Sequence, residues 1–170
     1  MNKAIRSDLL VLKVRFGLSI FAALVSNRGI HALIFYRISN YLYKKRIPFC
    51  PLLLTRIIQI VYSIDIDYRC TIYGGIIIIH GDGIVIGQGA IIGSGTVIYH
   101  QVTLGIKGSG LNEGFPTIKD NCVLGSGAKL LGNIVVGSGS IIGANCVVTS
   151  DIPPMSIVKS EPIKIYPLNR

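Results

Sequence analysis

Two histidines and one aspartate are the residues of this sequence whose types and spacing suggest acid–base chemistry. His80 stands two residues after Ile78, and His100 stands two residues after Ile98. Asp65 precedes His80 by 15 residues. A carboxylate beside a histidine can hold one tautomer of the ring and stabilise its cation, as a general base requires. The spacing alone leaves a catalytic base and an ordinary surface or core histidine equally open.

A period of six residues positions these side chains. Apolar residues keep this register at Ile66, Ile72, Ile78, Ile86, Ile92, Ile98, Leu104, Ile118, Leu124, Leu130, Val136, Ile142 and Val148. Neither an α-helix nor an alternating strand has this period, whereas a β-helix of hexapeptide repeats does. We therefore expect a mainly β fold, a parallel β-helix in which three repeats, about 18 residues, complete one triangular coil.

Two irregularities in the period predict where the coil departs from regularity. The register slips by two residues between Ile78 and Ile86, and it gains eight residues between Leu104 and Ile118. The eight extra residues must project, so we expect a Gly-rich loop at about residues 106–116, an insertion of the kind that often carries function. Because three repeats separate the two histidines, we expect their rings to stack one coil apart, with Asp65 near the same corner.

Residues 1–62 precede the repeat and show helical spacing of apolar residues. One helical stretch runs from Ile5 to Tyr43 with a break at residues 27–29, and a second runs from Pro51 to Tyr62. Proline is favoured at the start of a helix. We therefore expect two domains: a small α-helical region, residues 1–62, packed on the open first coil, and a β-helix with its projecting loop, residues 63–170.

Positive charge is concentrated in the first third of the chain. Residues 1–60 hold ten Lys or Arg and one acid, Asp8, whereas residues 61–170 hold seven of each sign. An anionic partner, such as a membrane surface touching residues 1–62, and a plain solvated helical face both stay open. We expect no nucleic-acid partner, because the bases are scattered along apolar helices and form no known binding motif.

Localisation follows from apolar run length and from the cysteines. The apolar stretches near the start are shorter than the roughly 18 residues that a membrane span needs, and no signal-peptide cleavage site follows them. Cys50, Cys70, Cys122 and Cys146 have neither CxxC spacing nor histidine companions, so we expect no metal and buried thiols in a reducing compartment. The prediction is a cytoplasmic protein, with the inner membrane surface as the alternative contact.

Several motifs together resemble the serine acetyltransferase family of hexapeptide-repeat acyltransferases, whose β-helices are left-handed. The matching segments are Asp65-Ile66 with His80, residues 102–105 (VTLG), 127–134 (GAKLLGNI), 151–154 (DIPP), 29–33 (GIHAL) and 36–38 (YRI). The resemblance implies an acetyl-CoA-dependent O-acetyltransferase without a metal. It also implies that His80 and Asp65 form the catalytic dyad and that a hydroxyl attacks the thioester directly.

The resemblance further implies the donor site and the assembly. Backbone N–H groups at the Gly105 turn would meet the oxyanion, and the pantetheine arm would lie in a groove between subunits. The residues expected to line that groove are Ser126, Gly127, Ala128 and Ala144. Lys159 and Lys164 either meet the nucleotide phosphates or are solvated tail lysines. We expect a homotrimer, and a dimer of trimers through residues 1–62 stays open.

The chain departs from the family where members that use serine hold the amino acid. Those members have an Asp before the catalytic His and an Asp-Arg-His-Pro loop, whereas this chain has Ile79 and residues 113–116 (EGFP). A zwitterion desolvated without paired charges costs on the order of several kcal/mol. We therefore expect a sugar or polysaccharide hydroxyl as acceptor, contacted by Asp82, His100, Glu113 and Phe115. L-Serine O-acetylation for cysteine synthesis is the alternative, and a non-enzymatic β-helical scaffold is a third reading.

Overall fold

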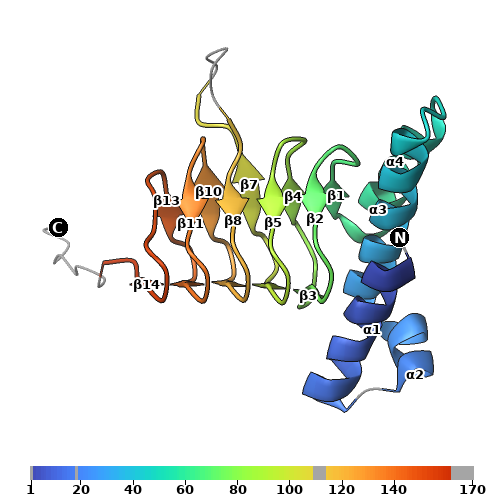
Figure 1. Cartoon of the computed structure of the whole chain (residues 1–170), viewed down its shortest axis with the longest axis horizontal. Helices are drawn as coiled ribbons and strands as arrows, with labels where there is room; N and C mark the ends of the chain where they lie inside the picture. The colour runs from blue at the N-terminus through green and yellow to red at the C-terminus, as the bar shows by residue number, and fades with distance from the viewer. Residues whose placement is uncertain (1, 18, 109–113, 162–170) are drawn as a thin grey trace, which may run out of the picture.

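The computed structural model describes residues 2–17, 19–108 and 114–161. Four helices lead into a stack of short strands (Figure 1). The helices are α1 (Asn2–Phe16), α2 (Ile20–Ser26), α3 (Arg28–Lys44) and α4 (Cys50–Tyr62). Within the described ranges no single helix is both long and apolar enough to cross a bilayer, although Lys3–Phe16 of α1 and α2 pass that test together as a pair bent by 104°.

The strands form three parallel sheets that make the three faces of a prism. Face A contains β1 (Asp65–Ile66), β4 (Val85–Ile86), β7 (Thr103–Gly105), β10 (Lys129–Leu131) and β13 (Val147–Val148). Face B contains β2 (Thr71–Ile72), β5 (Ile91–Ile92), β8 (Thr117–Ile118) and β11 (Val135–Val136). Face C contains β3 (Ile77–Ile78), β6 (Val97–Ile98), β9 (Val123–Leu124), β12 (Ile141–Ile142) and β14 (Ile157–Val158). The fold is a left-handed parallel β-helix of hexapeptide repeats, as expected.

The six-residue period places one apolar side chain of each strand inside the prism. Ile92, Ile98, Leu104 and Leu124 are each 0% exposed. Strand partners on face A, such as Val85 with Thr103 and Lys129 with Val147, lie one regular coil apart. The irregular spacings are Asp65 to Val85, which contains the two-residue slip, and Thr103 to Lys129, which contains the eight inserted residues.

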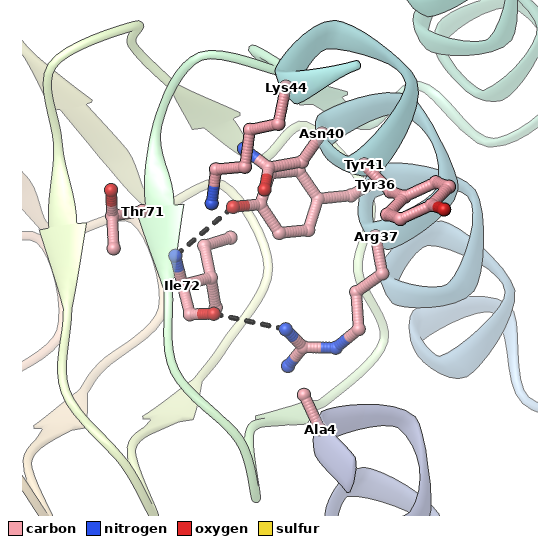
Figure 2. A pocket seen from close by; sticks show the side chains of 8 residues that line it. All are labelled: Ala4, Tyr36, Arg37, Asn40, Tyr41, Lys44, Thr71 and Ile72. Carbon is pink, nitrogen blue, oxygen red and sulfur yellow. Dashed lines mark hydrogen bonds between the residues drawn. The ribbon is translucent and has the colours of Figure 1, made fainter. Parts of the chain in front are cut away.

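Helix α3 covers the open edge of the first coil with polar side chains. Figure 2 shows that the Tyr36 hydroxyl accepts a hydrogen bond from Ile72 N at 3.1 Å, while Arg37 Nη1 donates to Ile72 O at 3.0 Å. The Tyr36 hydroxyl also donates to Cys70 O at 2.8 Å. These contacts satisfy backbone groups of β2 that no preceding coil can reach, and beside them lies a cavity of about 210 Å³. The helices thus protect an edge that is otherwise free to pair with another chain.

A buried ion pair joins α1 to α3, and its carboxylate also binds the first coil. Arg37 Nε and Nη2 donate to the two carboxylate oxygens of Asp8 at 2.7 and 3.1 Å. The carboxylate also accepts hydrogen bonds from Gly75 N and Ile76 N at 2.8 and 3.0 Å. Because Asp8 is 1% exposed and Arg37 is 6% exposed, removing either partner leaves the other charge buried and unpaired.

Two expectations about residues 1–62 are corrected by the structure. The first helical stretch breaks at Gly17 as well as at Asn27, because Gly17 adopts a left-handed φ of 65° and Ser19 caps α2 by accepting a hydrogen bond from Ala22 N. The expectation that all cysteines are buried is wrong for Cys50, which is exposed at the start of α4. Cys70, Cys122 and Cys146 are buried free thiols.

Candidate active site

One edge of the prism, between faces C and A, carries the candidate site. Ile78 pairs with Ile98, and Ile98 pairs with Leu124. The residues two positions after them are His80, His100 and Ser126, so they form a column along this edge. The rings of His80 and His100 lie edge to face with their centroids 5.9 Å apart, and Ser126 Oγ is 3.5 Å from His100 Nδ1.

His80 stands in an irregular corner that contains the two-residue slip. Its backbone has a left-handed φ of 64°, and Gly81 and Gly83 follow with φ of 70° and 67°. The regular corners also contain left-handed non-glycine residues, such as Gln101 after His100, with φ 60°. The ring is exposed, and no hydrogen bond to it occurs within the described part of the chain. His80 is therefore open to an acceptor.

A cavity of about 190 Å³ lies beside His80, where α2 and α3 meet face C. Its lining consists of Ser26, Asn27, Arg28, Gly29, Ile78 and His80. Gly29 permits this contact, since a Cβ there would be 2.6 Å from both Ile78 Cβ and Ile78 O. The close approach brings a cation, Arg28, to the cavity that His80 lines.

The Asp65 carboxylate is hydrogen-bonded to α4 and, among the described residues, not to His80. Its Oδ2 accepts a hydrogen bond from Gln59 Nε2 at 3.1 Å, and the Gln59 side-chain oxygen accepts one from Arg56 Nη1. Among the described residues, no hydrogen bond joins Asp65 to His80. The structure therefore places both expected dyad residues in the first coil without a hydrogen bond between them, and the dyad stays a prediction.

The third histidine, His31, connects three helices. Its Nε2 is 2.7 Å from Leu24 O, which can only accept, so this nitrogen donates. Nδ1 then accepts from the Tyr62 hydroxyl at 2.9 Å in the neutral ring. These bonds tie α2 and α4 to α3 and so support the wall of the cavity that contains Arg28.

The expected acceptor residues are spread over two edges of the prism. His100 is on the edge of His80, and Asp82 is exposed in the His80 corner. Phe115 is on the edge between faces A and B, where its ring covers Gly87 and Gly89 so closely that a Cβ on either would be 2.2 or 2.4 Å from it. Glu113 lies outside the described residues.

The expected donor residues continue the column of histidines toward the C-terminus. Leu124 pairs with Ile142, and Ile142 pairs with Val158, so Ser126 is followed by Ala144 and then by the segment that contains Lys159. Ser126 is half-buried and Ala144 is exposed. Ala128 is 0% exposed and offers a ligand only its backbone, like Gly127, whose N–H donates to His100 O at 3.0 Å.

Two further expected donor residues are not part of this column. Gly105 ends β7 on the opposite edge of face A, so within one chain it does not meet His80. Lys164 lies outside the described residues. Any joint role of Gly105 and His80 thus requires a second copy of the chain.

Arg28, Asn27 and Gln59 reach the site although sequence analysis assigned them no role. Arg28 and Asn27 directly precede Gly29 of the GIHAL segment, which was the available signal. Gln59 had no signal of its own, because its contact with Asp65 depends on how α4 packs against the first coil.

Comparison with known proteins gives a consistent family. The family description "Bacterial transferase hexapeptide (six repeats)" matches residues 115–150. The chain is 40% identical over 125 residues to the serine acetyltransferase of Helicobacter pylori (strain 26695), covering 74% of this chain and 73% of that protein. It is 45% identical over 142 residues to the serine acetyltransferase of Buchnera aphidicola (subsp. Schizaphis graminum), covering 81% of this chain and 53% of that protein. The chain thus spans about half the length of the Buchnera relative.

A solved structure resembles the chain at the level of the fold as well. The serine acetyltransferase of Neisseria gonorrhoeae in complex with serine superposes with a TM-score of 0.87 and 32% identity, covering 96% of this chain and 68% of that one. These relatives contradict the expectation of a sugar or polysaccharide acceptor, which is wrong. That expectation rested on charged residues that the family has and this chain lacks in the His80 motif, the loop and residues 16–27.

Proposed function

Because the chain belongs to the serine acetyltransferase family, we propose that it transfers the acetyl group of acetyl-CoA to the hydroxyl of L-serine. The observation that carries this proposal is His80, an exposed imidazole in a left-handed corner beside a small cavity. In this proposal a regular repeat supplies the scaffold and its one irregular histidine corner supplies the base.

The chemistry needs a base and a stabilised oxyanion. A hydroxyl is a weak nucleophile near neutral pH, so His80 removes its proton while the serine oxygen attacks the thioester carbonyl, a contribution of about 10² to 10⁴ in rate. The carbonyl oxygen becomes an oxyanion that requires hydrogen-bond donors. When the tetrahedral intermediate collapses, the C–S bond breaks and the imidazolium returns the proton to the thiolate of CoA. The products are O-acetylserine and CoA.

The donor is proposed to lie along the column that begins at His80. Ala144 is exposed and Ser126 is half-buried, so a thin pantetheine chain can approach the edge of the prism there. Lys159, at the end of β14 (Ile157–Val158), is exposed and is proposed to meet a nucleotide phosphate as a point charge.

A homotrimer is the assembly that we propose, because the site calls for a neighbouring copy of the chain. Gly105 and His80 lie on opposite edges of face A, so the proposed oxyanion donor can reach the base only from a neighbouring copy. Analytical ultracentrifugation of the full chain should give a trimer mass. A stable monomer with normal turnover would contradict the assembly. The division of the chain into a helical region, residues 1–62, and a β-helix, residues 63–170, is likewise a proposal.

Helices α1 and α2 are proposed to touch an anionic membrane surface. Val14 and Phe21 are each 78% exposed, and a groove of about 360 Å³ combines Leu9 and Leu10 with the cations Arg6 and Lys13. Two such faces in contact would bring like charges together, which disfavours a second copy as the occupant. Each base near an anionic surface contributes about 1 kcal/mol, and salt screens it. The cytoplasm stays the proposed compartment, since buried free thiols suit reducing conditions.

Sedimentation with vesicles tests the membrane contact. We expect the full chain to sediment with phosphatidylglycerol vesicles at low salt and to remain in solution with phosphatidylcholine vesicles. Equal recovery with both would leave the face as a solvated surface, and a hexamer mass would identify a second trimer as its occupant.

Acetyl transfer by the purified chain tests the function itself. With acetyl-CoA and L-serine we expect release of CoA thiol and a product of the mass of O-acetylserine, both strongly reduced in His80→Ala. The proposal fails if serine addition does not raise thiol release above the rate without acceptor.

A further inference from the structure

The cavity beside His80 carries a positive charge that no described residue neutralises. Arg28 is the one Lys or Arg in its lining. Within residues 2–17, 19–108 and 114–161, no hydrogen bond or ion pair involves the Arg28 guanidinium. We propose that Arg28 binds the carboxylate of L-serine in this cavity and thereby selects an amino acid as acceptor. This inference rests on the proposed function and assigns a residue to it.

Two other arginines that lie at the first coil, Arg37 of α3 and Arg69, differ from Arg28 in having a carboxylate partner. Arg37 is buried and held by Asp8 and by backbone carbonyls. Arg69 pairs with Asp67 at 2.7 Å. Both guanidinium groups therefore already have carboxylate partners, whereas Arg28 has none among the described residues. The planar fork of a guanidinium matches a carboxylate with two parallel hydrogen bonds.

The position of Arg28 relative to His80 is set by rigid elements. Arg28 is the first residue of α3, whose start is capped by Asn27 Oδ1 accepting from Ile30 N at 2.9 Å. Gly29 then packs directly on Ile78, with no room for a Cβ. Ile78 belongs to the strand that leads to His80. Arg28 and His80 thus lie on the two sides of the contact between Gly29 and Ile78.

Serine matches this arrangement in charge and size. Only its α- and β-carbons lie between the carboxylate and the hydroxyl oxygen, so a single small cavity can hold both groups. The cavity volume is about 190 Å³. An acceptor without a carboxylate would leave Arg28 without a partner after water is displaced, and this loses the benefit of a charge-assisted bond.

The test compares L-serine with L-serinamide, which lacks the negative charge. The full chain and Arg28→Met are assayed with saturating acetyl-CoA, and circular dichroism verifies folding. We expect the full chain to prefer serine by at least about tenfold in kcat/KM, as a charge-assisted hydrogen bond allows. Arg28→Met should raise the KM for serine by a similar factor, leave the KM for acetyl-CoA unchanged, and reduce the preference to near one.

Matched variants separate this role from general effects. Arg28→Lys should recover part of the preference, because it keeps the charge but loses the fork. Arg15→Met removes an equal charge from α1 and should leave the preference intact, and Arg28→Gln replaces Arg28→Met if that variant does not fold. Normal serine turnover with an unchanged preference in Arg28→Met overturns this inference alone. Absence of serine turnover in the full chain overturns the proposed function and this inference together.

Discussion

The first coil of the β-helix and the coils after it share one repeat but differ at the edge between faces C and A. In the first coil, residues 79–84 connect β3 to β4, whereas the shorter segment 99–102 connects β6 to β7. His80, in the longer connection, has an exposed ring, while His100, in the shorter one, is half-buried next to Ser126.

The difference shows what a repeating scaffold can and cannot supply. Regular coils provide equivalent corners, and the repeat alone does not make one corner chemically different from the others. The first coil gains its distinct chemistry from two additions, the extra residues at the His80 corner and the helices that bring Arg28 and Gln59 to it. The proposed site therefore lies where the repeat ends and the helical region begins.

The strongest way to break the comparison is to detach the helices from the first coil. Asp8→Ala leaves Arg37 buried without its carboxylate, and we expect a loss of about 3–5 kcal/mol in the free energy of unfolding. Urea denaturation of the full chain measures it. Asp67→Ala removes the exposed pair with Arg69 and should cost about 1 kcal/mol or less; equal losses in both variants would show that the Asp8 contact does not anchor the helices.

The two histidines test the comparison directly. We expect His80→Ala to lower kcat by at least about 10² with the KM for acetyl-CoA nearly unchanged, because the base is lost and donor binding is not. Asp65→Asn should lower kcat less, since the Asp65 carboxylate is hydrogen-bonded to Gln59 and does not itself accept the proton. Steady-state kinetics gives both values. If His100→Ala abolishes turnover and His80→Ala does not, the regular corner holds the base.

Glycine substitutions compare the irregular corner of His80 with a regular corner by introducing strain into each. Gly81 has φ 70° and a Cβ there would be 2.9 Å from Ile64 Cδ1, while Gly95 has φ 71° and a Cβ would be 2.3 Å from Asn121 Oδ1. Alanine at either position should cost about 1–3 kcal/mol. Only Gly81→Ala should also lower kcat, because it displaces His80. A kcat unchanged in Gly81→Ala at full folding would mean that the corner conformation does not position the base.

A smaller effect should appear at alkaline pH, where the first coil contains buried ionisable groups. Burial raises the pKa of the Cys70 thiol to about 12, and burial also raises the pKa of Tyr36. The unfolded thiol ionises near its ordinary pKa of 9.0, so this stabilisation is complete below that value and is lost as the pH rises toward the folded pKa. We expect a loss of about 1 kcal/mol near pH ~10 from Cys70.

Thermal melting between pH ~8 and pH ~10 measures this loss. Cys70→Ala should reduce the drop in Tm, whereas Cys50→Ala, which removes an exposed thiol, should leave the drop as it is. A drop of the same size in both variants would assign the alkaline sensitivity to other groups, with Tyr36 the first to examine.

Periodicity accounts for the part of the molecule that was predictable. Each apolar residue in the six-residue register has the same environment, so Ile92, Leu104 and Leu124 could be assigned to the core from sequence. Interruptions in the register located the His80 corner and the insertion between β7 and β8. The stacking of His80 and His100 followed from the same count.

The helical region was less predictable because its contacts join residues distant in sequence. Arg28 meets the His80 cavity only because Gly29 allows α3 to pack on β3, and Gln59 meets Asp65 only because α4 lies beside β1. The acceptor expectation was wrong because it was argued from absent family motifs, and absent motifs do not show which groups the fold brings to the site.

The column that starts at His80 has a regular spacing, which fixes distances along this edge of the prism. Successive positions along it are one strand spacing apart, roughly 4.8 Å, and the register Leu124, Ile142 and Val158 fixes how many steps separate Ser126 from the segment of Lys159. If Lys159 meets the nucleotide as proposed, the distance from phosphate to base is set by counting coils. An inserted coil between β9 and β12 would lengthen that distance by one step without altering any side chain at either end.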